Sequence, residues 1–175
     1  MGFSPTKMPF SLPKNLLASQ NTMSVLDRLI EKLDAGQIPY DVSHHEPVFT
    51  SEEAARIRGT TLASGAKALI CKADRRFVLI VLPADKRLAS KQVRKSESIR
   101  KLRFASREEV VELTGLQPGS IPPFGSLFDL PTWCDEDLAL QPTINFNAGD
   151  HTVSISMQYT DFAAFEQPLS GQFAE

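Results

Sequence analysis

Cysteine is scarce in this sequence, and long apolar runs are missing. Its two cysteines, Cys71 and Cys134, lie too far apart for any usual metal-binding spacing. Such usage fits a reducing compartment. The longest apolar run, Phe77–Leu82, is far shorter than the roughly 18–20 residues of a membrane helix. We therefore expect both cysteines to pack in an apolar core, and the protein to be cytoplasmic and without membrane contact.

Several catalytic signatures are also absent. The chain has no glycine-rich phosphate loop, no Gly-x-Ser-x-Gly elbow and no His-Glu-x-x-His pair, and no serine or cysteine lies in a recognisable nucleophile context. His44 and His45 are adjacent, so on a strand they would face opposite ways, and we expect no metal site there. If the chain is an enzyme, it would work by positioning and polarising its substrate, without a cofactor.

Positive charge is unevenly distributed along the chain. The net charge of −2 argues against a protein that binds nucleic acid over its whole surface. Between positions 86 and 107, however, nine basic residues face a single acid, Glu97. They are Lys86, Arg87, Lys91, Arg94, Lys95, Arg100, Lys101, Arg103 and Arg107. Such a run is either a solvated face or a surface that meets a phosphate backbone.

The chain divides into an extension and one domain. Residues 1–22 contain three prolines, no acidic residue and no apolar periodicity, which predicts a flexible extension. The lack of acid is shared with transit peptides, but arginine and an amphipathic pattern are missing. Residues 23–175 are enough for a single domain with a substantial core.

Short helices alternate with strand pairs in this domain. Capping residues and apolar periodicity predict helices over residues 24–36, 50–59, 89–96 and 106–115. Strand-like runs cover residues 40–44, 66–72, 76–82, 101–105, 126–130, 144–147 and 152–157. Residues 73–75 read as a hairpin turn, and the acidic triplet 135–137 as a solvated turn. Antiparallel pairs rather than strict strand–helix repeats indicate an α+β fold.

Lys67 is the first candidate functional residue. Strand alternation puts it on the same face as Leu69 and Cys71, where burying an ammonium is costly unless something compensates. It either extends to water at the end of the strand or is a fixed cation at the floor of a pocket. Its small neighbours Gly65 and Ala68 would leave room for a ligand there.

Two loops supply the other candidates. Residues 118–125, PGSIPPFG, hold three prolines and two glycines, which exclude a helix or central strand and make the backbone stiff. Residues 147–151, NAGDH, lie between two strand-like runs. They form either a plain hairpin turn or the hydrogen-bonding rim of a pocket.

The ordered set of segments resembles the YbaK/ProX (INS-like) aminoacyl-tRNA deacylases, relatives of the editing domain of bacterial prolyl-tRNA synthetase. The matching segments are HHEPVFTSEEAARIRG, GAKALICK, FVLIVLPADKRL, KLRFASREEVVELTGLQPGSIPPFG and FNAGDHTVSI, between His44 and Ile155. The resemblance implies a curved, mainly antiparallel mixed sheet ringed by helices. It also implies hydrolysis of the ester that joins a wrongly attached amino acid to a tRNA.

The resemblance also implies roles for single residues. Lys67 matches the lysine that contacts the substrate end of the tRNA, and Gly119 and Pro123 match the Gly-x-x-x-Pro loop at the aminoacyl pocket. We expect catalysis by Lys67 and by the backbone N–H groups of Gly119 and Ser120, which would polarise the ester carbonyl. The expected substrate-binding residues are Pro122, Pro123, Phe124, Gly125, Asn147, Ala148, Gly149 and His151. The candidate tRNA contacts are Lys86, Arg87, Lys91, Arg94 and Lys95.

The substrate is less tightly constrained, because members of this family clear alanine, cysteine, or serine and threonine. One methylene changes binding in an apolar pocket by only about 1–3 kcal/mol. The two loops look closer to those of the alanine-clearing members, so we expect removal of alanine from tRNA(Pro), with prolyl-tRNA synthetase or translation factors as further partners. Two alternatives stay open: an inactive tRNA- or synthetase-associated module of the same fold, and a protein that binds or hydrolyses a free nucleotide or small ester.

Overall fold

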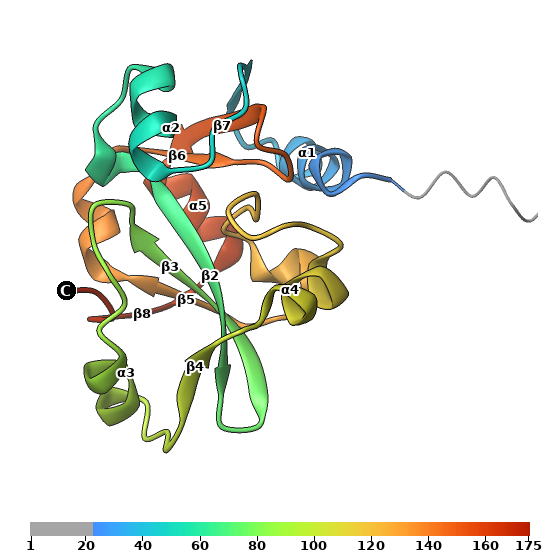
Figure 1. The fold of residues 1–175 in the computed structure, drawn as a ribbon. Helices are drawn as coiled ribbons and strands as arrows, with labels where there is room; N and C mark the ends of the chain where they lie inside the picture. Colours follow the sequence, from blue (N-terminus) through green and yellow to red (C-terminus); the bar gives the residue numbers. More distant parts are fainter. Residues whose placement is uncertain (1–22) are drawn as a thin grey trace, which may run out of the picture.

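The structure, a computed structural model, describes residues 23–175, so the predicted extension over residues 1–22 lies outside the described residues. The helices are α1 (Val25–Ala35), α2 (Ser51–Arg58), α3 (Ser90–Ser96), α4 (Arg107–Thr114) and α5 (Tyr159–Glu166), with 3₁₀ turns η2 (Leu62–Ser64), η3 (Gly125–Phe128) and η4 (Glu136–Leu140). The strands are β1 (Asp41–His44), β2 (Ala66–Ala73), β3 (Arg76–Pro83), β4 (Leu102–Phe104), β5 (Thr132–Asp135), β6 (Thr143–Asn147), β7 (Val153–Gln158) and β8 (Leu169–Gly171). Figure 1 shows their arrangement.

The strands form two sheets. In the first, β7 pairs antiparallel with β1 on one side and β6 on the other. The second has the order β4-β2-β3-β5-β8, antiparallel up to β3 and parallel beyond it. A bridge between Gly65 and Asn145 joins the two sheets. The predicted α+β class with mixed, mainly antiparallel pairing is confirmed, and the strands divide between two sheets rather than one.

Local signals in the sequence explain where the helices begin and end. Thr50 caps α2 and Ser106 caps α4, and the glutamate three residues later completes a capping box in each. Gly59 and Gly115 end these helices with φ angles of 67° and 70°, which residues with a Cβ rarely adopt. No helix within residues 23–175 combines the length and apolar character needed to cross a membrane.

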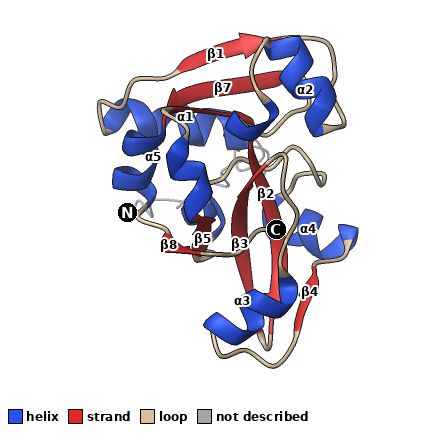
Figure 2. Ribbon diagram, turned by 90° about the vertical axis from the view of Figure 1, so that its left-hand side faces the viewer, coloured by secondary structure: helices blue, strands red, loops and turns tan. Residues whose placement is uncertain are grey.

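Two clusters of buried side chains form the core. The larger one lies between the three-stranded sheet, α1, α5 and one face of the β2–β3 hairpin, and the smaller one lies on the other face beside α3 (Figure 2). Cys71 and Cys134 are 0% and 1% exposed, which confirms that both are core residues. Burial raises the pKa of both thiols to about 12, so neither supplies a thiolate at neutral pH.

The segment after the proline-rich loop differs from the prediction. Residues 126–130, predicted as a strand, belong mainly to η3. The Leu127 N–H donates to Phe124 O and the Leu130 N–H to Gly125 O, so the backbone groups that a strand would offer to a neighbour are used locally. The strand of this region is β5, which the sequence analysis did not predict, and α5 and β8 were also missed.

Asp135 is buried, so the prediction of a solvated turn was wrong for the first residue of the acidic triplet. Its carboxylate accepts the backbone N–H groups of Phe173 (2.7 Å), Ala174 (2.8 Å) and Asp137 (3.0 Å). A buried carboxylate is tolerated where several donors replace its water shell. Asp135 thereby fixes the C-terminal residues against the end of β5.

Replacement of Asp135 by alanine is expected to lower the free energy of unfolding by roughly 2–4 kcal/mol, because it leaves buried N–H groups without an acceptor. Urea unfolding followed by circular dichroism measures this change. Glu136→Ala is the matched control, since it removes the same charge from an exposed neighbour. Equal midpoints for the two variants would contradict the structural role given to Asp135.

Candidate active site

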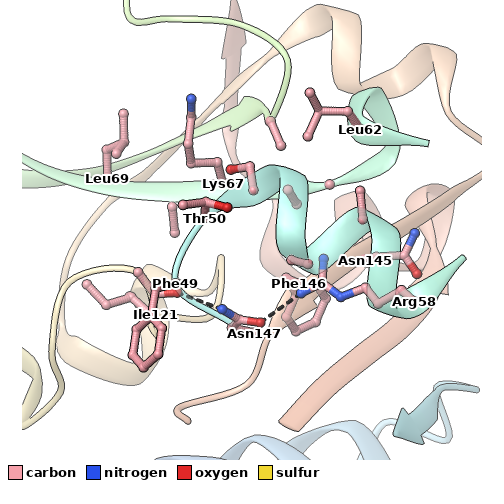
Figure 3. Close-up of a pocket in the computed structure, with 18 of the residues that line it drawn as sticks. Phe49, Thr50, Arg58, Leu62, Lys67, Leu69, Ile121, Asn145, Phe146 and Asn147 are labelled. Carbon is pink, nitrogen blue, oxygen red and sulfur yellow. Dashed lines mark hydrogen bonds between the residues drawn. The ribbon is translucent and has the colours of Figure 1, made fainter. Parts of the chain in front are cut away.

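A cavity of about 220 Å³ lies where the two sheets meet (Figure 3). Its walls come from five parts of the chain: residues 49–58 around α2, residues 61–69 leading into β2, Ala84 after β3, the loop after α4, and β6. Of the residues predicted to be functional, Lys67, Gly119 and Asn147 line it. They are separated by up to 80 residues in sequence, and the fold brings them together around one space.

Lys67 is the second residue of β2, where it lines the cavity and is half-buried. Its Nζ donates to the backbone carbonyl of Lys86 at 2.6 Å, which leaves two of the three ammonium protons for other acceptors. Burial lowers the pKa of Lys67 below its ordinary value, while the nearby Glu52 acts in the opposite direction. Leu69 lines the same cavity, as do Ala66 and Ala68 from the opposite side of the strand.

Asn147 connects three segments at the cavity wall. Its Nδ2 donates to Gly119 O at 2.9 Å, and its Oδ1 accepts from Arg58 Nη2 at 2.8 Å (Figure 3). Arg58 Nε also donates to Ser154 Oγ at 2.8 Å. Through these bonds α2, β6, β7 and the loop after α4 are held in one arrangement.

Arg58 is a site residue that the sequence analysis missed. It has no carboxylate within ion-pair distance among residues 23–175, so its charge faces only neutral groups and the cavity. Burial lowers its pKa to about 10, and it stays cationic at neutral pH. The signal was present in the sequence: Arg58 lies four residues after Ala54, on the same face of a helix that has small residues on this side.

Fewer residues of the PGSIPPFG loop line the cavity than predicted. Gly119 and Ile121 line the cavity, whereas residues 122–125 are buried and do not. Phe124 is in the core, where its ring meets those of Phe146 and Phe162 edge-on at 5.6 and 5.3 Å. These four predicted substrate-binding residues therefore do not line the cavity, and Phe124 packs against its wall residue Phe146 from the core side.

Ser120 lies outside the cavity lining and is buried. Its N–H and its hydroxyl both donate to Gln117 O, at 3.2 and 2.8 Å, and its carbonyl accepts the Gly149 N–H at 2.8 Å. The Ser120 N–H is thus engaged within the loop. The Gly119 N–H makes no backbone hydrogen bond among the described residues.

The NAGDH turn supports this loop rather than lining the cavity as a whole. Asn147 and Gly149 each make one of its two hydrogen bonds to the loop. Ala148 is buried in the core. His151 Nδ1 lies 2.9 Å from Val48 O, and its ring is packed beneath that of Phe49.

The predicted tRNA contacts fall into two groups. Lys86 and Arg87 lie near the cavity, and Lys86 forms an ion pair with Asp137. Lys91, Arg94 and Lys95 are exposed on α3, at the end of the β2–β3 hairpin opposite to α2 (Figure 1). Among residues 23–175 no group of three or more His, Cys, Asp or Glu side chains could hold a metal ion.

Comparisons with known proteins identify the family. The model of the aminoacyl-tRNA editing domain matches residues 45–165, and the chain belongs to this family. It is 36% identical over 146 residues to the multifunctional Ser/Thr-tRNA deacylase ProXp-y of Escherichia coli K12, covering 81% of this chain and 87% of that one. It is 26% identical to the prolyl-tRNA editing protein ProX of Acetoanaerobium sticklandii, over 79% of this chain and 88% of that protein.

The fold is also found among solved structures. A crystal structure of a protein proposed to be a trans-editing enzyme for prolyl-tRNA synthetase superimposes with a TM-score of 0.77 at 24% identity, covering 87% of this chain and 98% of that one. The predicted family and fold are therefore confirmed, as is the predicted enzyme class, a hydrolase that acts on aminoacyl-tRNA esters.

Arg58→Met is expected to slow ester hydrolysis roughly 10- to 100-fold, because Asn147 loses the partner that fixes its amide and the Gly119 carbonyl can shift. It should also cost about 1–3 kcal/mol of stability through unpaired polar groups. Deacylation kinetics and urea unfolding measure the two effects. Arg56→Met, which removes an exposed arginine from the same helix, is the control, and equal rates for both variants would refute this role for Arg58.

Proposed function

We propose that this protein is a trans-editing deacylase that removes alanine from mischarged tRNA(Pro). The observation that carries the proposal is the meeting of a half-buried lysine, an exposed loop glycine and a fixed asparagine amide around one small cavity. Membership of the aminoacyl-tRNA editing family supplies the reaction class. Small side chains on the wall, including Ala54, Ala68 and Ala84, suit a small aminoacyl group.

In the proposed mechanism, Lys67 anchors the terminal phosphate or ester region of the tRNA. Its carbonyl partner at Lys86 fixes the ammonium in position, and the two remaining N–H groups are available to the substrate. An aminoacyl ester is already activated, so orientation and charge stabilisation supply most of what hydrolysis requires.

Gly119 is proposed to stabilise the charge that develops on the ester oxygen. Its N–H takes the role first assigned to both Gly119 and Ser120, because the Ser120 N–H is engaged with Gln117 O. Water attacks the ester carbon, the bond from this carbon to the ribose oxygen breaks, and the ribose oxygen leaves with a proton. The products are the free amino acid and the uncharged tRNA.

The PGSIPPFG loop is proposed to select the amino acid by size. Ile121 is its side chain on the cavity wall, while Pro122 and Pro123 have fixed φ angles and are buried behind it. A wall that cannot retreat would exclude the proline side chain and admit alanine.

Serine and threonine are the second candidate substrates. The relative named as a Ser/Thr-tRNA deacylase, with 36% identity, favours them, and Thr50, Ser51 and Asn145 offer polar groups to a substrate hydroxyl. A site built around such a hydrogen bond would reject alanine by about 10⁴-fold or more. Alanine and serine cleared at similar rates would instead indicate selection by size.

The proposed partners are mischarged tRNA(Pro) and, through it, prolyl-tRNA synthetase or translation factors. Lys86, Arg87 and the exposed cations of α3 would meet the phosphate backbone beyond the cavity. We place the protein in the cytoplasm, where its tRNA substrate is charged.

Lys67→Ala is expected to lower deacylation of Ala-tRNA(Pro) by at least about 100-fold, because the charge that positions the substrate is lost. The unfolding midpoint should be nearly unchanged. The experiment compares wild type and variant on alanine-, serine-, threonine- and cysteine-charged tRNA(Pro). Lys72→Ala, which removes a lysine of the same strand that lies over the Phe77 ring, is the control. Full activity of Lys67→Ala on all four substrates would sink the assignment.

Ile121→Ala is expected to raise hydrolysis of correctly charged Pro-tRNA(Pro) by about 10-fold or more relative to Ala-tRNA(Pro), because the cavity wall recedes. Pro123→Gly should act in the same direction by loosening the loop. Pro118→Gly alters an exposed position of the same loop and is the control. If the ratio of the two rates is the same in all these proteins, the loop does not set amino-acid choice.

A further inference from the structure

Phe49 is a large aromatic side chain at the mouth of the cavity, and it is 72% exposed. Its backbone is firmly held, because its N–H donates to Glu53 Oε2 at 2.9 Å and the next residue, Thr50, caps α2. The only other aromatic side chain on the cavity wall of the described residues is Phe146, which is 2% exposed. Phe49 therefore offers an apolar ring to whatever occupies the cavity mouth.

The ring of Phe49 is supported by His151. The two ring centroids are 4.9 Å apart with an interplanar angle of 41°. His151 is itself fixed, since its Nδ1 lies 2.9 Å from Val48 O, and the Val48 N–H donates to His151 O at 3.0 Å. At Gly119, a Cβ would lie only 3.3 Å from Cε1 of His151, so the glycine allows the loop to approach this ring closely.

We propose that Phe49, supported by His151, is the platform on which the terminal base of the tRNA stacks. This inference rests on the proposed deacylation. The ester to be cleaved and the terminal base are attached to the same ribose, so the base must lie within one nucleoside of Lys67 and Gly119. Phe49 is the exposed aromatic residue on that wall, and proteins commonly hold unpaired bases by stacking them on aromatic side chains.

Stacking on Phe49 would give the terminal nucleotide a second point of attachment, besides its contact with Lys67. A base offers a flat π-face and needs no hydrogen-bond partner from the ring. Phe49 fixes the base on one side of the ribose, while Lys67 holds the phosphate or ester on the other. Two attachments to one nucleotide would set the rotation of the ester carbonyl towards Gly119.

The test uses an uncharged tRNA(Pro) acceptor-stem hairpin that carries 2-aminopurine as its 3′-terminal base, since the fluorescence of this base is quenched on stacking. Wild type is titrated alongside Phe49→Ala, Phe49→Trp and Phe104→Ala. Phe104→Ala is the matched control, because Phe104 is also an exposed phenylalanine, at 57%, and does not line the cavity. Urea unfolding verifies that each variant is folded.

We expect wild type, Phe49→Trp and Phe104→Ala to quench the fluorescence, and Phe49→Ala to lose the quench and to bind about 5- to 150-fold more weakly. With charged hairpins, Phe49→Ala should raise KM on the normal 3′-adenosine substrate, and should match wild type on a substrate whose terminal ribose lacks its base. Equal quenching by wild type and Phe49→Ala would overturn the inference, as would an equal loss in Phe104→Ala.

Failure of the inference and failure of the proposed function are distinguishable. If wild type hydrolyses no charged tRNA but quenches through Phe49, the stacking site stands and deacylation falls. If wild type deacylates and Phe49→Ala has an unchanged KM and quench, deacylation stands and the stacking site falls. A Phe49→Ala defect confined to binding of prolyl-tRNA synthetase would assign the ring to a protein contact and would also overturn the inference.

Discussion

The side-chain amide of Asn147 is the contact on which the geometry of this site depends. It donates to the loop through Gly119 O and accepts from α2 through Arg58, while its backbone belongs to β6. A side chain with one donor and one acceptor group can join two such partners, whereas aspartate or leucine of the same size cannot. The cavity is defined by the distance between these segments, so this amide sets its width.

The site concentrates positive charge in a protein whose net charge is −2. Arg58 and Lys67 both lose part of their hydration, and their hydrogen-bond acceptors are the neutral oxygen atoms of Ser154, Asn147 and Lys86. Such cations are costly in the unliganded protein, and an anionic substrate would recover part of this cost. Because salt screens charges over about 10 Å, the attraction due to these two cations is confined to the neighbourhood of the cavity.

Much of the fold could be predicted because its signals are local. Capping boxes at Thr50 and Ser106 and the β2–β3 hairpin depend on residues within a few positions of one another, and all three were found. By contrast, β5 is only four residues long and pairs in parallel with strands far away in sequence. Periodicity cannot show such pairing, and the local pattern of residues 126–130 indicated a strand where η3 forms.

The same distinction applies to the site. Lys67 drew attention as a lysine on the apolar face of a strand and Asn147 as the first residue of a turn between two strands, and the fold places both on the cavity. The positions of Arg58, Ile121 and Phe49 at the cavity depend on segments that are distant in sequence. The Arg58–Asn147 contact, for example, spans 89 residues. No local pattern marks Pro122 and Pro123 as buried rather than facing the cavity. Their position follows from the aromatic core around Phe124.

The position of Lys67 depends on the far end of the chain. The carbonyl that it contacts belongs to Lys86, and the next residue, Arg87, exchanges two backbone hydrogen bonds with Glu175. Asp135 holds Phe173 and Ala174 in the same place. Shortening the chain by its last three residues would therefore release the segment that seats the lysine, although none of the deleted residues lines the cavity.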